Sequence, residues 1–344
     1  MCMACILAGC GQGWSDPASP AFPISELNPR WFSFQGEQTA GPVSGLCYRQ
    51  DTQTLLVYDD YAGLLRVYID SGIMESIYSP GIQAALQFSG DCSRLMGSTR
   101  TERKADRFGV EHEYIYDVRI WDVSTGEEVA CYGDCDQNNR NPIEIGAALD
   151  PLGDSPIIYS EASYVFLGDF PLNKIKMIHE PDETSPNIDK IVFSPNSIRF
   201  VMAYLEGGVY VGNDVLYGTR RIERNDPDHR AAVTALAMDP TEHFVARIRD
   251  DRLMVWKFGV FYKKVLIDTA LEGESLLTFD REGRYLLVGG NDHIQVWDLD
   301  LKEITAEIPA VGITAMILSQ DNHLLIWGDE HGGVYMLGDA NADN

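Results

Sequence analysis

Short apolar strands recur along the chain, and each ends in a polar turn. Seven such transitions are recognisable, and their turns contain, in order, Asp51, Asp91, Pro151, Pro195, Pro240, Arg281 and Asp321. The steps between these positions are 40, 60, 44, 45, 41 and 40 residues. A repeat of about forty residues that contains several short strands is typical of a β-propeller.

The sixth unit shows the pattern most clearly. Apolar runs separated by turn-forming residues predict four strands, at 276–279, 285–288, 294–297 and 304–308. In the third of these strands, alternation places Ile294, Val296 and Asp298 on one face, and Gln295 and Trp297 on the other. Both faces therefore need a partner, and the tryptophan is large enough to fill the space between neighbouring blades.

The third strands of several units resemble those of WD40 repeats. Segment 294–298 reads IQVWD, segment 118–122 reads VRIWD, and segment 253–257 reads LMVWK. The resemblance covers residues 31–338 and implies a WD40-like propeller. The family pattern is divergent, or belongs to a neighbouring propeller type, because no Gly-His pair precedes the first strands. Four units also replace the tryptophan by another aromatic residue, at Tyr68, Phe166, Tyr210 and Tyr335.

The two ends of the repeat region complement each other. The last unit runs out after its third strand, at 333–337, whereas the apolar segment 31–34 precedes the first unit with no partner of its own. Pairing these two segments would bury edges that an open ring exposes. The sequence therefore predicts an all-β, seven-bladed β-propeller of four-stranded antiparallel blades, the last blade closed by the N-terminal strand.

The N-terminal ten residues are small and apolar up to Cys10, and the segment 7–10, LAGC, resembles the lipobox of bacterial lipoproteins. That resemblance implies cleavage before Cys10 and acylation of this cysteine. Residues 1–10 would then be a signal segment, 11–30 a flexible Pro-rich tether, and 339–344 a disordered tail. The protein would sit at the bacterial cell envelope, on the periplasmic or extracellular side. If the leader is false, the protein is a cytoplasmic scaffold.

The net charge narrows the choice of partners. Lys and Arg total 27 against 52 Asp and Glu, which leaves a formal charge of −25. Such a body is repelled by nucleic acid and by anionic lipid headgroups, so membrane attachment is expected only through the lipid on Cys10. Cationic, neutral or protein partners remain, of which we expect a protein, and the propeller itself is expected to be a monomer.

Cationic side chains nevertheless gather in two places. One group lies in the long second unit, at Arg100, Arg103, Lys104 and Arg107, and another near the crossing from the fourth to the fifth unit, at Arg220, Arg221, Arg224 and Arg230. The first group lies in an insertion between the second and third strands of its unit, and the second lies near a crossing between units. Loops at these two places emerge on the same face of a propeller. We expect a rim that orients an acidic partner, unless these residues pair with nearby carboxylates.

The cysteines and acidic turns offer little chemistry. Cys131 and Cys135 are close enough in sequence to form a disulfide in an exported protein, and Cys47 is interpreted as a small core residue. Asp134, Asp136 and Asn138 resemble the start of a calcium loop, but Asn139, Pro142 and Ile145 depart from the remaining pattern. No metal site is therefore predicted.

Motifs for catalysis are not found in the chain. It has no nucleophile elbow, zinc-protease motif, dinucleotide fingerprint or phosphate-binding loop. We therefore expect a non-catalytic protein–protein interaction scaffold without a cofactor. The alternative is an enzyme or small-ligand-binding propeller with its site at the central channel.

Overall fold

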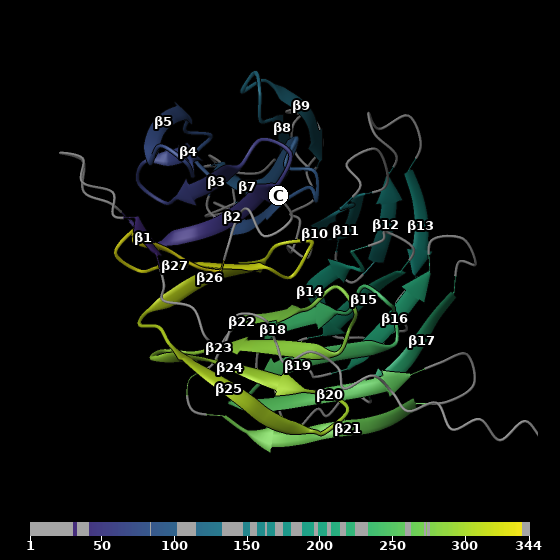
Figure 1. The fold of residues 1–344 in the computed structure, drawn as a ribbon. Helices are drawn as coiled ribbons and strands as arrows, with labels where there is room; N and C mark the ends of the chain where they lie inside the picture. Colours follow the sequence, from purple (N-terminus) through teal and green to yellow (C-terminus); the bar gives the residue numbers. More distant parts are fainter. Residues whose placement is uncertain are drawn as a thin grey trace, which may run out of the picture.

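The computed structural model describes residues 30–32, 41–82, 84–101, 115–132, 147–151, 157–161, 164–168, 175–179, 188–195, 199–204, 208–213, 218–223, 233–258, 263–271, 273 and 276–338. Every regular element in these ranges is a β-strand, and the strands are numbered β1 to β28 (Figure 1). No helix in the described ranges has the length and apolarity that crossing a membrane requires.

Six of the sheets are each built from four consecutive strands, and every strand pairs antiparallel with the next. Blade one contains β2 (Val43–Arg49), β3 (Thr54–Asp59), β4 (Gly63–Tyr68) and β5 (Ile73–Tyr78). Blade two contains β6 (Ala84–Phe88), β7 (Arg94–Thr101), β8 (Ile115–Asp122) and β9 (Glu128–Tyr132). Blade three contains β10 (Ala147–Leu149), β11 (Ile157–Glu161), β12 (Tyr164–Gly168) and β13 (Ile175–His179).

Blades four to six repeat this arrangement. They contain β14 (Ile188–Phe193), β15 (Arg199–Tyr204), β16 (Val209–Asn213) and β17 (Gly218–Glu223); β18 (Val233–Met238), β19 (Phe244–Arg249), β20 (Arg252–Phe258) and β21 (Lys263–Ala270); and β22 (Leu276–Phe279), β23 (Tyr285–Gly289), β24 (His293–Asp298) and β25 (Glu303–Pro309).

A further sheet joins the two ends of the chain. It has the order β1-β28-β27-β26, from β1 (Arg30–Phe32), β26 (Ile313–Leu318), β27 (Leu324–Asp329) and β28 (Val334–Gly338). In its register, Trp31 lies opposite Tyr335. We call this sheet the composite blade.

The prediction of a seven-bladed propeller, its last blade closed by the N-terminal strand, needs a correction: the structure has six blades built from consecutive strands, not seven. Six blades are continuous four-stranded units, whereas the composite blade takes only three strands from its own stretch of sequence. Its fourth strand, β1, has three residues and starts at Arg30, not over the predicted 31–34. This sheet differs from the other six because the chain enters the ring through β1 and leaves it through β28, which lie in the same sheet.

The sheets form a closed ring around their innermost strands. The strands β2, β6, β10, β14, β18, β22 and β26 contact one another in this order, and β26 contacts β2 (Figure 1). This arrangement is a β-propeller.

Side chains on both faces of each sheet hold the ring together. In β24, Trp297 packs with Ile248 and Val255 of blade five, whereas Ile294 and Val296 pack on the opposite side with the composite blade. The predicted separation of these residues onto two faces is confirmed. Apolar packing between neighbouring sheets is therefore the main source of stability.

A recurring side chain closes the turn between the first and second strands. The residue that follows the innermost strand is a buried serine or aspartate in six blades, and these residues are Ser89, Asp150, Ser194, Asp239, Asp280 and Ser319. Where its bonds are described, the side-chain oxygen accepts the backbone N–H five residues later, as from Arg94 to Ser89 at 2.9 Å and from Leu324 to Ser319 at 2.9 Å. Blade one differs, because the exposed Arg49 occupies this position.

Among these turn residues Asp280 has an unusual titration. Burial raises the pKa of its carboxyl to about 6; the hydrogen bond from the Tyr285 N–H opposes this rise, and the Glu282 carboxylate adds to it. The folded protein therefore keeps a proton on Asp280 that the unfolded chain releases near pH 4. The stability that this proton contributes is present below about pH 4 and is lost as the pH rises through 6.

We expect Asp280→Asn to stabilise the protein at neutral pH, because the amide oxygen can still accept from Tyr285 while the buried charge is removed. The gain in free energy of unfolding should be on the order of 2 kcal/mol near neutral pH and should shrink toward pH 4. Denaturant unfolding of both proteins across this pH range measures the difference.

Asp239→Asn is the matched control. The Asp239 carboxylate accepts the N–H groups of Thr241 at 2.9 Å and His243 at 2.8 Å, and also the Thr241 hydroxyl. An amide cannot accept all of these bonds, so this variant should lose stability. A destabilised Asp280→Asn protein at neutral pH would contradict the assignment.

Candidate functional site

Three hollows lie side by side where blades one and two meet the composite blade. The first, the channel hollow, has a volume of about 440 Å³ and is bounded by the innermost strands β2, β6 and β26. Its wall is largely apolar, with Leu46, Leu86, Phe88, Met316 and Leu318. It can accept an apolar group at the centre of the ring.

The second hollow, the mouth hollow, lies at the turns that follow β2 and β6. It measures about 350 Å³ and shares Tyr48, Gly90 and Gln320 with the channel hollow. Burial, with the Asp321 and Asp70 carboxylates, raises the pKa of Tyr48 to about 12. Tyr48 is therefore protonated at neutral pH, and its hydroxyl donates to Gln53 at 2.9 Å.

The third hollow, the interblade hollow, lies between blades one and two. It measures about 500 Å³ and shares Arg49 and Ser93 with the mouth hollow. The rest of its lining is Thr52, Thr54, Leu56, Arg66, Tyr68, Cys92, Asp122, Val123 and Ser124. Because each hollow shares residues with the next, the three form one path, called here the groove, from the channel to the space between the blades.

The interblade hollow has a cause in the sequence of blade one. Arg66 lies in β4 opposite Leu56, the third residue of β3. The same register position holds an apolar residue in the other blades whose side chains are described there, namely Ile120, Val211, Val255, Val296 and Met336. All five are buried, whereas the Arg66 side chain is 32% exposed. An apolar contact between two blades is thus replaced by an open space with a guanidinium at its edge.

The charges lining the interblade hollow are unevenly compensated. Asp122 accepts from the Ser124 hydroxyl and N–H, from the Thr125 N–H and from Arg94; these bonds, led by that of the hydroxyl, lower its pKa to about 2 against the opposing effect of burial. Arg66, by contrast, donates no hydrogen bond to any described residue, and its Nη1 lies 4.0 Å from Glu75 Oε2. Its donors are therefore available to a ligand.

The second cation, Arg49, forms one exposed ion pair. Its Nη2 donates to Asp51 Oδ2 at 3.1 Å, and 43% of its side chain is exposed. Such an exposed pair is worth little and exchanges readily with another carboxylate.

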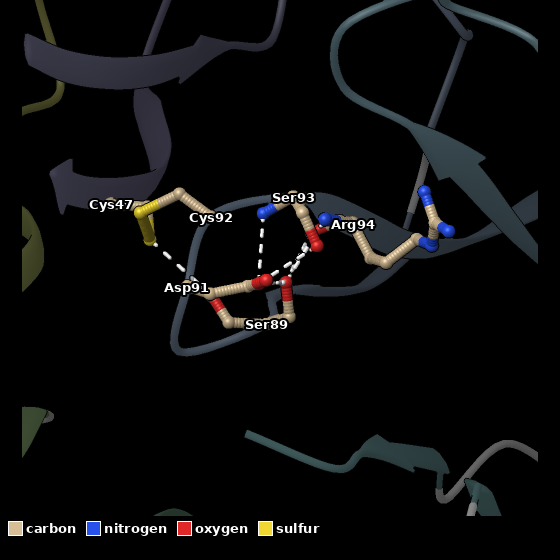
Figure 2. Close-up of a disulfide and its surroundings, with 6 residues drawn as sticks. All are labelled: Cys47, Ser89, Asp91, Cys92, Ser93 and Arg94. Carbon is tan, nitrogen blue, oxygen red and sulfur yellow. Dashed lines mark hydrogen bonds between the residues drawn. A yellow bond between two sulfur atoms is a disulfide. The ribbon is translucent and has the colours of Figure 1, made fainter. Parts of the chain in front are cut away.

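A disulfide holds the two sides of the groove together. Cys47 of β2 is bonded to Cys92 in the turn after β6, with the Cα atoms 5.8 Å apart (Figure 2). Asp91 orders that turn, since its Oδ1 accepts from the hydroxyl groups of Ser89 and Ser93 and from the Ser93 N–H (Figure 2). Cys47 lines the channel hollow and Cys92 the interblade hollow.

This disulfide corrects the interpretation of Cys47 as a simple core residue. The two cysteines are 45 residues apart, about one repeat, so their spacing carries no local signal. The propeller register supplies the missing signal: the ends of first strands in consecutive blades lie next to each other. Arg49 and Arg66 were missed in the same way, because their significance appears only when the blades are aligned.

The structure places only part of the predicted basic rim. Arg100 lies in β7 opposite Tyr116; Arg220 and Arg221 lie in the outer strand β17, opposite Val211 and Tyr210. Blade three separates these two sheets. The remaining members, Arg103, Lys104, Arg107, Arg224 and Arg230, lie outside the described residues, so the common rim stays a prediction.

The other predicted sites are only partly covered. Cys131, in β9, is disulfide-bonded, while Cys135 lies outside the described residues, so the pairing of the two stays a prediction. Cys10 and the calcium-loop residues Asp134, Asp136 and Asn138 also lie outside them. Elsewhere in the described ranges, no group of three or more His, Cys, Asp or Glu side chains is arranged to hold a metal ion.

The double variant Cys47→Ala/Cys92→Ala should lose about 2–4 kcal/mol of unfolding free energy, because the bond constrains a loop of roughly one blade in the unfolded chain. Thermal unfolding with and without a thiol reductant measures this loss. Reductant should lower the melting temperature of the wild type more than that of the variant, whose residual response reports the disulfide of Cys131. Equal responses would show that the Cys47–Cys92 bond does not stabilise the ring.

Comparisons with known proteins do not assign this chain to a family. No protein-family model matches the chain, and no curated protein matches it. The closed ring of antiparallel sheets is therefore what places the chain among the β-propellers.

Proposed function

We propose that this protein is a non-catalytic, WD40-like interaction scaffold that binds another protein in the groove between blades one and two. The observation that supports this most directly is the break in the repeat at blade one. There the turn-closing serine or aspartate is replaced by Arg49, and an interblade apolar residue is replaced by Arg66. Departures from a repeat that create an open polar space are expected at functional sites.

The position of the groove supports a binding role. Turns and loops on a rigid scaffold commonly carry binding residues, and the groove joins the turns of two blades to the central channel. The WD40-like third strands supply such a scaffold, since Trp121, Trp256 and Trp297 are each buried between two sheets. The rigid sheets would hold the groove open for a partner.

An exported location agrees with the disulfide between the first two blades. Disulfides persist in oxidising compartments and are rare in the bacterial cytosol. Cys47 and Cys92 are also buried, which protects their bond. We therefore propose that the protein is a lipoprotein of the bacterial cell envelope, attached through Cys10.

A small-ligand site at the channel is the second candidate. The channel hollow of about 440 Å³ lies within the range of ligand pockets and has an apolar wall with a few polar groups, such as Ser44 and Thr314. A ligand of this kind would bind without any requirement for Arg49 or Arg66.

Filling the interblade hollow should abolish partner capture. Thr52 is exposed and lines this hollow, so Thr52→Trp places an indole there and removes no described side-chain hydrogen bond. Immobilised full-length protein would be incubated with solubilised envelope proteins, and the bound proteins quantified by mass spectrometry. A specific partner should be retained by the wild type and fall at least about tenfold with Thr52→Trp.

Leu301→Trp is the matched control, because Leu301 is exposed in a turn of blade six on the same face of the ring. This variant should capture the partner as the wild type does. If every captured protein binds both tryptophan variants equally, the groove is not the binding site and the scaffold proposal fails.

Mass spectrometry of the native N-terminus tests the location separately. We expect a mature chain that starts at an acylated Cys10, recovered with the membrane fraction and released when Cys10 is replaced by serine. A native chain that retains Met1 and carries no lipid would overturn the envelope proposal while leaving the binding groove untouched.

A further inference from the structure

We infer that the interblade hollow binds a carboxylate of an acidic, extended segment of the partner protein, with Arg66 as its main counter-ion. This inference rests on the proposed function and specifies the chemistry of the same groove. Its starting point is that Arg66 occupies a position that five other blades fill with a buried apolar side chain. A guanidinium there gives up apolar packing between two sheets, so its presence calls for a compensating interaction.

The contacts of Arg66 within the protein do not make up for the apolar packing that is lost at this position. Within the described part of the chain, Glu75 is the only carboxylate within 4.0 Å of its guanidinium, and this distance is beyond that of a hydrogen bond. Tyr68 holds Glu75 by donating to its Oε2 at 3.1 Å. The planar guanidinium therefore keeps donors that match a carboxylate in bidentate geometry.

The rest of the hollow favours a single negative charge. Its lining has the cations Arg49 and Arg66 against one carboxylate, Asp122, which Arg94 already compensates. This cationic lining contrasts with the formal charge of −25 of the whole chain. Glu75 and Asp51 lie close enough to repel a doubly charged phosphate more strongly than a carboxylate, so an acidic side chain is the better ligand.

The shape of the groove indicates what accompanies the carboxylate. The interblade hollow continues through the mouth hollow to the apolar channel hollow, where Leu46, Phe88 and Leu318 form part of the wall. An extended segment could place an acidic side chain between the blades and an apolar side chain in the channel. The occupant is therefore a peptide segment with both groups.

The test begins with an unbiased probe. A random twelve-residue peptide library displayed on phage is selected against immobilised full-length protein. We expect the enriched peptides to share an Asp or Glu at a constant distance from a large apolar residue. The best peptide is then synthesised with a fluorophore, together with versions that carry Gln or phosphoserine in place of the acidic residue.

Fluorescence anisotropy with these peptides forms a double-mutant cycle. Arg66→Met restores the residue type of the composite blade and should weaken binding of the acidic peptide at least about tenfold. The Gln peptide should lose as much against the wild type, but should lose nothing further against Arg66→Met. The phosphoserine peptide should bind the wild type more weakly than the acidic peptide.

Two protein variants give opposite controls. Glu75→Gln removes the competing carboxylate and should tighten binding of the acidic peptide severalfold. Arg281→Met makes the same chemical change as Arg66→Met at an exposed turn of blade six and should leave binding unchanged. Thermal unfolding should show Arg66→Met to be as stable as the wild type or more so; if it is less stable, the Gln peptide still tests the carboxylate on unaltered protein.

The outcomes separate this inference from the proposed function. Enriched peptides that bind the groove, as shown by their loss with Thr52→Trp, but show no coupling to Arg66 overturn the carboxylate and leave the scaffold standing. A selection without enriched peptides, or tighter binding of the phosphoserine peptide, also overturns the inference. The scaffold proposal itself fails only with the capture experiment.

Discussion

Where side chains are described, the sheets of this protein carry apolar residues on both faces, and the rest of the structure depends on the need to cover both. A single blade cannot bury these faces, and a row of blades would leave one face open at each end. Closing the row into a ring removes both exposed faces at once. The contact between β26 and β2, far apart in sequence, is the joint at which this happens.

The interface between blades one and two meets the need to cover apolar faces only in part. Trp121 fills part of the space between blades one and two, with Leu56 and Leu64 from the opposite sheet. Toward the turns, however, apolar contact gives way to Thr54, Arg66 and a covalent bond between Cys47 and Cys92. The disulfide can hold two sheets together where packing does not, which lets this interface tolerate polar residues without separating.

Much of the fold could be read from residue patterns, because strand alternation and turn chemistry act locally. Ile294 and Trp297 face opposite neighbours as alternation requires, and Ser89 and Asp239 close turns at the places where apolar runs end. The pairing of the N-terminal strand with the last repeat also followed from unmatched strands, although β1 is shorter than expected.

The site was harder to predict because its residues act through register. Neither Arg66 in β4 nor Cys47 in β2 belongs to a local motif, and each looks ordinary beside its sequence neighbours. The role of Arg66 becomes visible when it is compared with Val296, which holds the same register position in blade six. The role of Cys47 becomes visible in its bond to Cys92 of blade two. Charge runs such as that around Arg220 are visible in a sequence, but their partners across space are not.

The composite blade has a consequence for how the protein is made. Trp31 and Tyr335 lie opposite each other, although almost the whole chain separates them. The ring therefore cannot close until β26 to β28 have been synthesised and are free to pair with β1, and earlier blades must wait with an uncovered face. Closure is thus a late event in folding, because it needs strands from both ends of the repeat region.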